Sequence, residues 1–283
     1  MNRGPSGLIP LIGAALVGLA AVSVIAQAPQ REITRIAGEV YRFRNLGHTS
    51  VFAVTSAGII ATDPIDRAAA EWLKAELASH FDLPVRYLIY SHGHADHISG
   101  GEVFADTAVV IAHHKAKLAI MQDKVQTAPP QKTFADSLTI ELGGTIAELS
   151  HVGRNHSDNS IVVRFPKERV LFAVDFIPVN SVAYRDFPDG YFPDWLDSLK
   201  RVEAMDFDIL APGHGPLGKK EDVRIHRLFL EDLQSQVARA VAEGKSLEET
   251  KKSVTLAKYS SWQGYQDMHQ LNIEGMYRIV SGR

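Results

Sequence analysis

The sequence predicts an α/β fold built as a four-layer αββα sandwich, in which two β-sheets pack together between outer layers of helices. Three observations support this prediction. Strand-like segments alternate with segments of helical spacing in both halves of the 283-residue chain. The second half repeats the layout of the first in outline, and each half ends in helices, so helices are expected on both outer faces. No low-complexity linker divides residues 29–283, which we expect to form one domain with a helical C-terminal segment over 219–283.

The first 28 residues have the pattern of a secretory signal peptide. Arg3 is the one charged residue, residues 8–25 are apolar or small, and Ala26-Gln27-Ala28 has the small-x-small form of a cleavage site. The apolar run is near the ~18 residues needed to span a bilayer, so a retained anchor is the alternative. Pro10 and the Ala-x-Ala ending favour removal. We therefore expect a periplasmic or secreted protein without stable membrane association after cleavage.

The composition excludes several classes of partner and of reactive site. The formal net charge is −3, which argues against a nucleic-acid partner and leaves a small-molecule substrate as the expected one. The chain contains no cysteine, which excludes disulfides, a thiolate nucleophile and cysteine metal ligands. Nothing in the sequence fixes the oligomeric state.

Hydrophobic periodicity places the elements of the first half. Apolar or alternating runs predict strands, and apolar residues three and four apart predict helices. Strands are expected at 39–44, 50–55, 58–62, 85–90 and 108–111, and helices at 66–79, 100–105 and 112–122. The stretch 123–133, with two consecutive prolines, is predicted as a loop.

The second half follows the same logic. Pro166-Lys167-Glu168 predicts a hairpin turn. Residues 176–194 are rich in aromatics and prolines and are predicted to be irregular. The segment 176–195 is a candidate wall for a substrate, and packing of its aromatics against the C-terminal helices is the alternative. Strands are expected at 137–141, 145–150, 160–164, 169–174 and 208–211, and helices at 195–205 and 221–241, followed by further helix.

The segment Ser91-His92-Gly93-His94-Ala95-Asp96-His97 carries the strongest functional signal. It follows a strand that reads as buried, and small residues separate the histidines, which suits a tight loop with converging side chains. Imidazole and carboxylate groups are ligands suited to zinc, with iron or manganese as alternatives. A solvated histidine-rich loop is the competing interpretation, but the density of the pattern favours a metal site.

Three later residues fit the same site, because each stands at the end of a predicted strand or in the loop after it. His156 lies in the segment 153–159, Asp175 ends the strand 170–174, and His214 lies in Pro212-Gly213-His214-Gly215. Each could merely cap a turn. Their joint occurrence, in this order after the first motif, indicates one site.

With these motifs the chain resembles the metallo-β-lactamase-fold hydrolase superfamily over roughly residues 33–218. The resemblance implies the metallo-β-lactamase fold and two zinc ions. It also implies that His92, His94 and His156 bind the first metal, that Asp96, His97 and His214 bind the second, and that Asp175 bridges both. Asp63, which ends the strand 58–62, matches an acidic position of the family and is expected to brace the metal loop from outside the ligand shell.

The resemblance implies a zinc-dependent hydrolase of an ester, lactone, thioester or amide, β-lactams included. In this reading Asp96 is the catalytic residue that orients the attacking hydroxide, and His48 and Tyr184 are candidate substrate contacts. Asp175 stands where the best-known zinc β-lactamases have cysteine and is similar to glyoxalase II-type thioesterases and lactonases. The signal peptide instead resembles the exported β-lactamases, so the substrate class stays open.

Three other functions are alternatives on this sequence. A mononuclear iron oxygenase of the same fold, similar to the persulfide dioxygenases, would use the first-site ligands, and metal analysis would distinguish it. A nuclease would need a basic groove, which the acidic charge argues against. A non-catalytic binding protein on this fold would be expected to have lost ligands, and none is missing here.

Overall fold

The computed structural model describes residue 1 and residues 30–282. Apart from Met1, the predicted signal peptide lies outside the described residues. Of the helices within that described part, none combines the length and the apolar character needed to cross a membrane.

The first sheet has seven strands in chain order, from β1 to β7. Strands β1 to β4 pair antiparallel, and β4 to β7 pair parallel. Its strands are β1 (Arg31–Ala37), β2 (Val40–Asn45), β3 (His48–Thr55), β4 (Gly58–Thr62), β5 (Val85–Ile89), β6 (Val109–His113) and β7 (Lys132–Phe134).

The second sheet has six strands in the order β13-β12-β11-β10-β9-β8. All neighbours are antiparallel except β11 and β12, which run parallel. Its strands are β8 (Ser137–Leu142), β9 (Thr145–His151), β10 (Ile161–Phe165), β11 (Val170–Ala173), β12 (Ile209–Pro212) and β13 (Gly218–Lys219).

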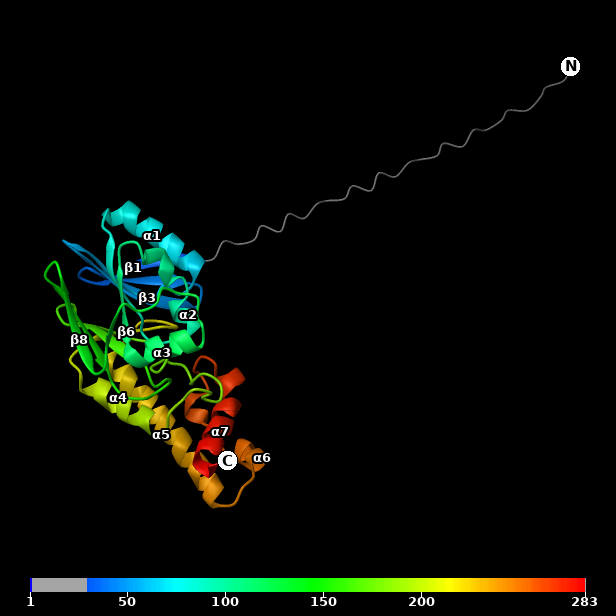
Figure 1. Ribbon diagram of the computed structural model, residues 1–283. Coiled ribbons are helices and arrows are strands. Elements are labelled where there is room, and N and C mark those ends of the chain that lie inside the picture. The colour runs from blue at the N-terminus through cyan, green and yellow to red at the C-terminus, as the bar shows by residue number, and fades with distance from the viewer. Residues whose placement is uncertain (2–29, 283) are drawn as a thin grey trace.

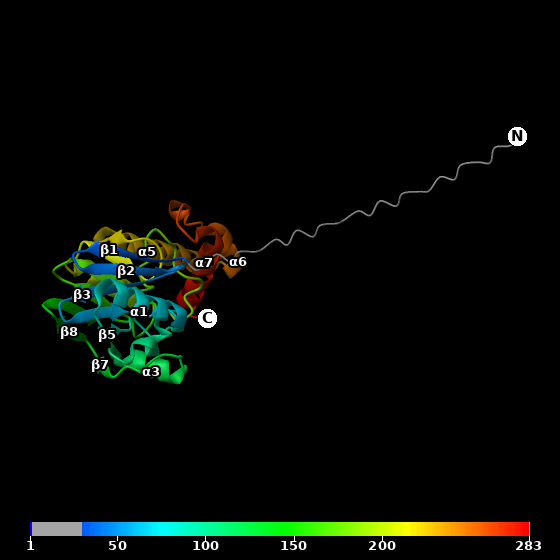
Figure 2. The same cartoon turned by 90° about the horizontal axis from the view of Figure 1, so that it is seen from above.

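Helices cover the outer face of each sheet, which confirms the predicted αββα sandwich (Figures 1 and 2). The first sheet is covered by α1 (Arg67–Phe81) and α3 (His114–Gln122), and the second by α4 (Asp194–Ala204) and α5 (Lys220–Ala242). Helices α6 (Leu247–Ser253) and α7 (Tyr265–Ser281) extend one end of the molecule together with the end of α5. Short helices α2 (Ala95–Ile98), η1 (Gly101–Phe104) and η2 (Ala257–Tyr259) complete the fold.

Alternation of side chains along the strands builds three apolar layers. In β4, Ile59 and Ala61 face the α1 layer, whereas Ile60 faces the second sheet. In β11, Leu171 faces the α4 and α5 layer and Phe172 faces the first sheet. Because successive strand residues point to opposite faces, continuous apolar strands are required where both faces are covered.

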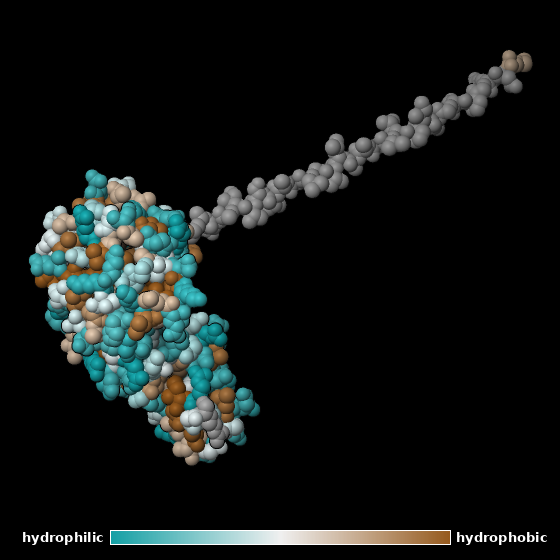
Figure 3. Space-filling model, viewed as in Figure 1, coloured by the Kyte–Doolittle hydropathy of each residue, from teal (hydrophilic) through white to brown (hydrophobic). Residues whose placement is uncertain are grey.

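The molecular surface is mixed in polarity. On the face seen in Figure 3, hydrophilic and hydrophobic residues are interspersed over the sandwich, and hydrophobic residues gather most at the end formed by the C-terminal helices. The exposed large apolar residues come from several elements, and two of them, Leu118 and Met121, lie together on α3. Exposed apolar residues of this kind are common on globular surfaces.

Some local predictions differ from the structure. The edge strands β1, β7 and β13 and the helix α2 were not predicted, and β7 begins inside the stretch predicted as loop. His113 ends strand β6, so α3 begins at His114, two residues later than predicted. These differences lie at the rims of the sheets and do not alter the layers.

Backbone hydrogen bonds join the two sheets at one edge. The amide of Thr49 donates to the carbonyl of Gly213 at 2.8 Å, and the amide of Ile161 donates to the carbonyl of Ser91 at 2.8 Å. His48 and His214 also form an isolated antiparallel bridge. The ends of β4, β5, β11 and β12 therefore meet at this edge, where loops can bring side chains from distant parts of the chain together.

Buried His226 on α5 should lower the stability of the fold. It is 1% exposed, and neither ring nitrogen has a hydrogen-bond partner among the described residues. Trp195 and Phe229 pack around it, and burial lowers the pKa of His226 to about 3. We expect His226→Leu to raise the free energy of unfolding by about 1–3 kcal/mol at pH 8, because it removes unpaired polar atoms.

The pH dependence of that gain gives a second check. His226 stays neutral in the folded state down to about pH 3, whereas in the unfolded state it takes up a proton below about pH 6.5. The free energy of unfolding therefore decreases as the pH falls from about 6.5 to about 3. The difference in unfolding free energy between His226→Leu and the unmodified protein should thus be larger at pH 5 than at pH 8, as measured by denaturant unfolding. The exposed-site variant His80→Leu serves as the control, and a loss of stability in His226→Leu would refute the prediction.

Candidate metal centre

Seven residues predicted as metal ligands meet at the edge where the sheets join. Together with His48, which was predicted as a substrate contact, they form two groups of four, and within each group the candidate ligand atoms all lie within 4.8 Å of one another. The first group contains His92, His94, His156 and Asp175, and the second contains His48, Asp96, His97 and His214. The division into His92, His94 and His156 on one side and Asp96, His97 and His214 on the other is the one that the family resemblance implied.

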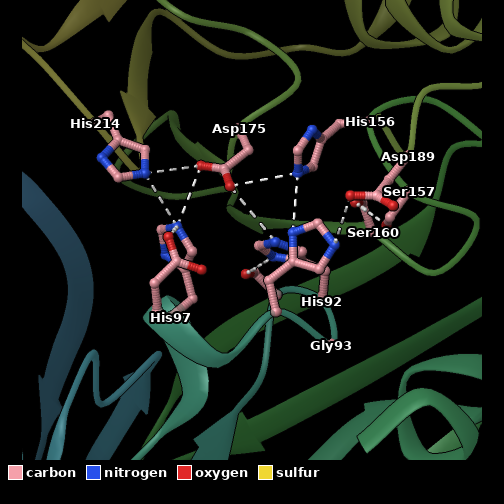
Figure 4. A network of polar contacts seen from close by, with 12 residues as sticks. His92, Gly93, His97, His156, Ser157, Ser160, Asp175, Asp189 and His214 are labelled. Carbon is pink, nitrogen blue, oxygen red and sulfur yellow. Dashed lines mark hydrogen bonds and ion pairs between the residues drawn. The ribbon is translucent and has the colours of Figure 1, made fainter. Parts of the chain in front are cut away.

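Asp175 lies between the two groups (Figure 4). Its Oδ1 is 3.2 Å from Nε2 of His97 and 3.2 Å from Nε2 of His214. Its Oδ2 is 3.5 Å from Nε2 of His92 and 3.5 Å from Nε2 of His156. The residue follows β11 with a positive φ of 66°, a strained conformation that turns the chain directly after the strand. One carboxylate thus presents an oxygen to each group.

In the first group, neighbouring residues fix which ring atoms face the centre. The Ser91 hydroxyl lies 2.9 Å from Nδ1 of His92, which leaves Nε2 of that ring directed at Asp175. Nδ1 of His94 and Nε2 of His156 are 3.0 Å apart. Burial lowers the pKa of His92 to about 3 and lowers the pKa of His156, so both rings are neutral and hold free lone pairs, as metal binding requires.

In the second group, His97 and His214 approach through Nε2 atoms that are 3.2 Å apart. Nδ1 of His214 donates to the carbonyl oxygen of Gly47 at 3.0 Å, which directs its other nitrogen inward. Gly213 permits this approach, because a Cβ there would lie 2.5 Å from a Val174 methyl and 2.9 Å from the His97 ring. The small residue in the Pro-Gly-His-Gly motif is therefore required by close packing at the site.

Asp63 supports the second group from behind. It is fully buried; its Oδ1 accepts the Ser91 amide hydrogen at 2.8 Å, and its Oδ2 lies 3.8 Å from Nδ1 of His97. Burial raises the pKa of Asp63 to about 6, although His97 and the Ser91 hydrogen bond oppose the shift. The contact with the outer ring nitrogen of His97 is the kind made by residues that orient metal-binding histidines.

The donor set fits a pair of metal ions. Nε2 of His92 and Oδ1 of Asp175 are buried atoms without a hydrogen-bond partner among the described residues, and both point into the cluster. Unpaired buried polar atoms are unfavourable unless something else satisfies them. Imidazole nitrogens and carboxylate oxygens converging in this way provide the ligands that zinc and other divalent transition metals use.

Asp96 and His48 form a pair at the cavity side of the second group. Nε2 of His48 donates to Oδ2 of Asp96 at 3.3 Å, and the same carboxylate oxygen lies 3.6 Å from Nε2 of His97. The hydrogen bond from His48 lowers the pKa of Asp96 below its usual value, although burial opposes this. His48, which the sequence suggested as a substrate contact, both lines the cavity and contacts Asp96.

A cavity of about 700 Å³ opens onto the two groups. Tyr184, the other predicted substrate contact, lines it with an exposed side chain, and the predicted wall over 176–195 supplies Pro178, Ser181, Val182, Pro188 and Asp189 as well. The position of Asp189 beside His94, with its Oδ2 4.0 Å from Nε2 of His94, was not predicted. The contact of Ser91 with His92 and the C-terminal contributions of Gln263 and Met268 were not predicted either. No sequence pattern marks these positions, because they lie in loops or on a helix far along the chain.

Metal affinity should rise with pH. Burial opposes protonation of His97, but Asp175, Asp63 and Asp96 outweigh it and raise the pKa of His97 to about 9 in the metal-free protein. A metal ion that takes Nε2 must displace that proton, so zinc affinity should increase by up to about tenfold per pH unit between about pH 6.5 and 8.5. Calorimetric titration of the metal-free protein in two buffers of different ionisation enthalpy measures the protons released. Affinity that is constant across this range, with no proton release, would count against the assignment.

Comparison with known proteins agrees with this geometry. The family model described as the metallo-beta-lactamase superfamily matches residues 64–214, just over half of the chain. The 2,4-dinitroanisole O-demethylase subunit alpha of Nocardioides sp. is 30% identical over 162 residues, which are 56% of this chain and 49% of that protein. The chain thus spans about half the length of that relative.

Metallo-beta-lactamase relatives are more distant in sequence but align over more of the chain. The metallo-beta-lactamase type 2 of Bacteroides fragilis is 26% identical over 67% of this chain and 81% of its own length. A solved metallo-beta-lactamase from Pontibacter korlensis superposes with a TM-score of 0.63 at 20% identity, covering 69% of this chain and 96% of that one. The structural likeness establishes the shared fold.

Proposed function

The chain belongs to the metallo-beta-lactamase superfamily, and we propose that it is a zinc hydrolase that cleaves an ester, lactone, thioester or amide bond. The observation that carries the proposal is the Asp175 carboxylate, which presents one oxygen to each of two histidine groups. His92, His94 and His156 would hold one ion, and Asp96, His97 and His214 the other. Bound zinc supplies Lewis acidity and makes water acidic enough to act as a nucleophile near neutral pH.

Asp96 is the residue that we assign to proton handling. Its carboxylate is ionised at neutral pH, and the side chain remains half exposed toward the cavity. The hydrogen bond from Nε2 of His48 fixes one oxygen of the carboxylate, which orients the group for accepting a proton from the nucleophile and returning it to the leaving group. Tyr184 and the segment around it would bind the substrate beside this group.

A hydrolysis panel on zinc-loaded protein tests the proposal. It contains β-lactams, homoserine lactones, glutathione thioesters and simple aryl esters, with His94→Ala and metal-free protein as controls. We expect at least one class to be hydrolysed by the unmodified protein only, with the variant folded by circular dichroism. Equal rates for His94→Ala, or no hydrolysis of any class, would reject the proposal.

The relative from Nocardioides supports a second candidate, removal of a methyl group from an aryl ether. Release of methanol from 2,4-dinitroanisole, assayed with the same controls, tests it. An iron oxygenase of the same fold is tested by metal analysis of purified protein and by oxygen uptake with a persulfide substrate. Iron at one ion per chain with oxygen uptake would replace the zinc proposal.

We also propose that the protein is exported and acts on a small molecule, with no nucleic-acid partner. The apolar run over 8–25 and the Ala-x-Ala ending support export. The acidic net charge supports the exclusion of nucleic acid. N-terminal sequencing of the protein after expression in a Gram-negative host should find a chain that begins at residue 29 in the periplasmic fraction. An intact N-terminus in the membrane fraction would show a retained anchor instead.

A further inference from the structure

Outside the two histidine groups, the lining of the cavity is mainly apolar, and we call this part of the lining the wall. Pro178, Val182, Tyr184, Pro188 and Met268 line it, and Ser181 and Gln263 add uncharged polar groups. An apolar substituent of a substrate can leave water on such a surface.

Asp189 is the one charged group of that wall. Among the described residues that line the cavity, no lysine or arginine is found, and outside the two histidine groups Asp189 supplies the single carboxylate. Two arginines that contact the segment around Asp189 are paired: Arg154 with Asp194 at 2.6 Å, and Arg278 with Asp186 at 3.0 Å. Arg185 lies in the same segment and is exposed, but it does not line the cavity. Within the described residues, the only ion-pair contact of Asp189 is with His94, at 4.0 Å.

Asp189 lies at the edge of the metal cluster, where it would contact a substituent of the substrate and not the bond that is cleaved. Its Oδ2 is at the outer ring nitrogen of His94, and Figure 4 shows it at the rim of the cluster. Its side chain is 59% exposed, so its charge acts through partly hydrated space and falls off with salt. A substrate carboxylate placed on this wall, away from the two metal sites, would meet the like charge of Asp189, and no lysine or arginine among the described residues of the cavity lining would offset it.

We propose that the cavity selects uncharged or cationic substrates with an apolar substituent, and that Asp189 discriminates against substrates that carry a carboxylate. The proposal rests on the proposed hydrolase function and names its substrate class. It predicts that β-lactams, which carry a carboxylate, are poor substrates relative to uncharged esters or lactones. Specificity here comes from a repulsive element as much as from an attractive one.

Three aryl esters with the same leaving group and equal chain length test the proposal. Their acyl chains end in a methyl, a carboxylate or a trimethylammonium group, so the reacting bond and its contact with the metal site are the same. We expect kcat/KM of the carboxylate ester to be about tenfold or more below that of the methyl ester. The ratio of kcat/KM for the methyl ester to kcat/KM for the carboxylate ester should fall several fold, toward one, in Asp189→Asn, which keeps an acceptor oxygen beside His94. In the unmodified protein, 0.5 M NaCl should lower the same ratio.

Two controls separate charge from structure. Asp197→Asn removes an exposed carboxylate of α4 outside the cavity and should leave the ratio unchanged. The metal content of Asp189→Asn should equal that of the unmodified protein. A preference of the unmodified protein for the carboxylate ester, or an unchanged ratio in Asp189→Asn, overturns the proposal.

Equilibrium binding tests the inference independently of hydrolysis. The amide analogues of the methyl and carboxylate esters are titrated into metal-free protein by calorimetry. We expect the uncharged amide to bind more tightly, by a factor that shrinks in Asp189→Asn. If the hydrolysis panel finds no activity on any class but this order of binding holds, the hydrolase function fails and the charge selection stands; equal or reversed affinities refute the selection.

Discussion

Asp175→Asn should bind fewer than two zinc ions per chain and lose at least about 1,000-fold in kcat/KM. Asparagine keeps the size of the side chain but has one acceptor oxygen and no charge. It can therefore face one histidine group only, where the carboxylate faces both, with Oδ1 toward His97 and His214 and Oδ2 toward His92 and His156. Metal analysis after gel filtration and steady-state kinetics on the best substrate of the panel measure both effects.

Asp197→Asn is the matched control for that variant, because it makes the same chemical change on an exposed helical surface. It should bind as much zinc as the unmodified protein and retain its activity. Two zinc ions per chain in Asp175→Asn, with kcat/KM within tenfold of the unmodified value, would show that the carboxylate does not join the two groups.

Asp96→Asn should lower kcat by about 100- to 10,000-fold, the range expected for loss of a positioned general base. Asparagine cannot accept a proton at the atom that His48 now orients at 3.3 Å. The first group contains none of the atoms that change, so at least one zinc ion per chain should remain. Because the apolar wall is untouched, KM should change much less than kcat.

The comparison of Asp96→Asn with His48→Asn separates proton handling from metal binding. His48→Asn leaves the Asp96 carboxylate in place but removes the hydrogen bond that orients it, and we expect a smaller loss of kcat, of about 10- to 100-fold. If kcat of Asp96→Asn stays within threefold of the unmodified value, Asp96 has no catalytic role. If both variants lose all zinc, the residues serve metal binding alone.

The layers of the fold could be predicted from sequence because burial on both faces leaves continuous apolar strands. The run of β4, Gly58 to Thr62, and that of β11 are buried at every position and were found in the right places. The edge strands β1, β7 and β13 were missed for the opposite reason. β1 mixes Arg31, Glu32 and Arg35 with apolar residues and is half exposed, and β13 has two residues only. A strand at an edge is defined by its pairing with a neighbour, which local periodicity does not show.

The convergence of the histidines could also be anticipated, because the motifs stood at predicted strand ends. The contacts between loops that are distant in the chain could not be predicted from the sequence. The contact of Ser91 with His92, the pairing of His48 with Asp96, and the place of Asp189 beside His94 depend on how loops cross the sheet edge. Contributions from Gln263 and Met268 depend on where the C-terminal segment packs.

Anomalous diffraction from crystals of the zinc-loaded protein, recorded on both sides of the zinc absorption edge, tests the central claim most directly. The account predicts two zinc peaks per chain, one among His92, His94 and His156 and the other among Asp96, His97 and His214, with the Asp175 carboxylate between them. A single peak in the first group would leave the second group without its assigned role. Peaks elsewhere, with none in either group, would contradict the account.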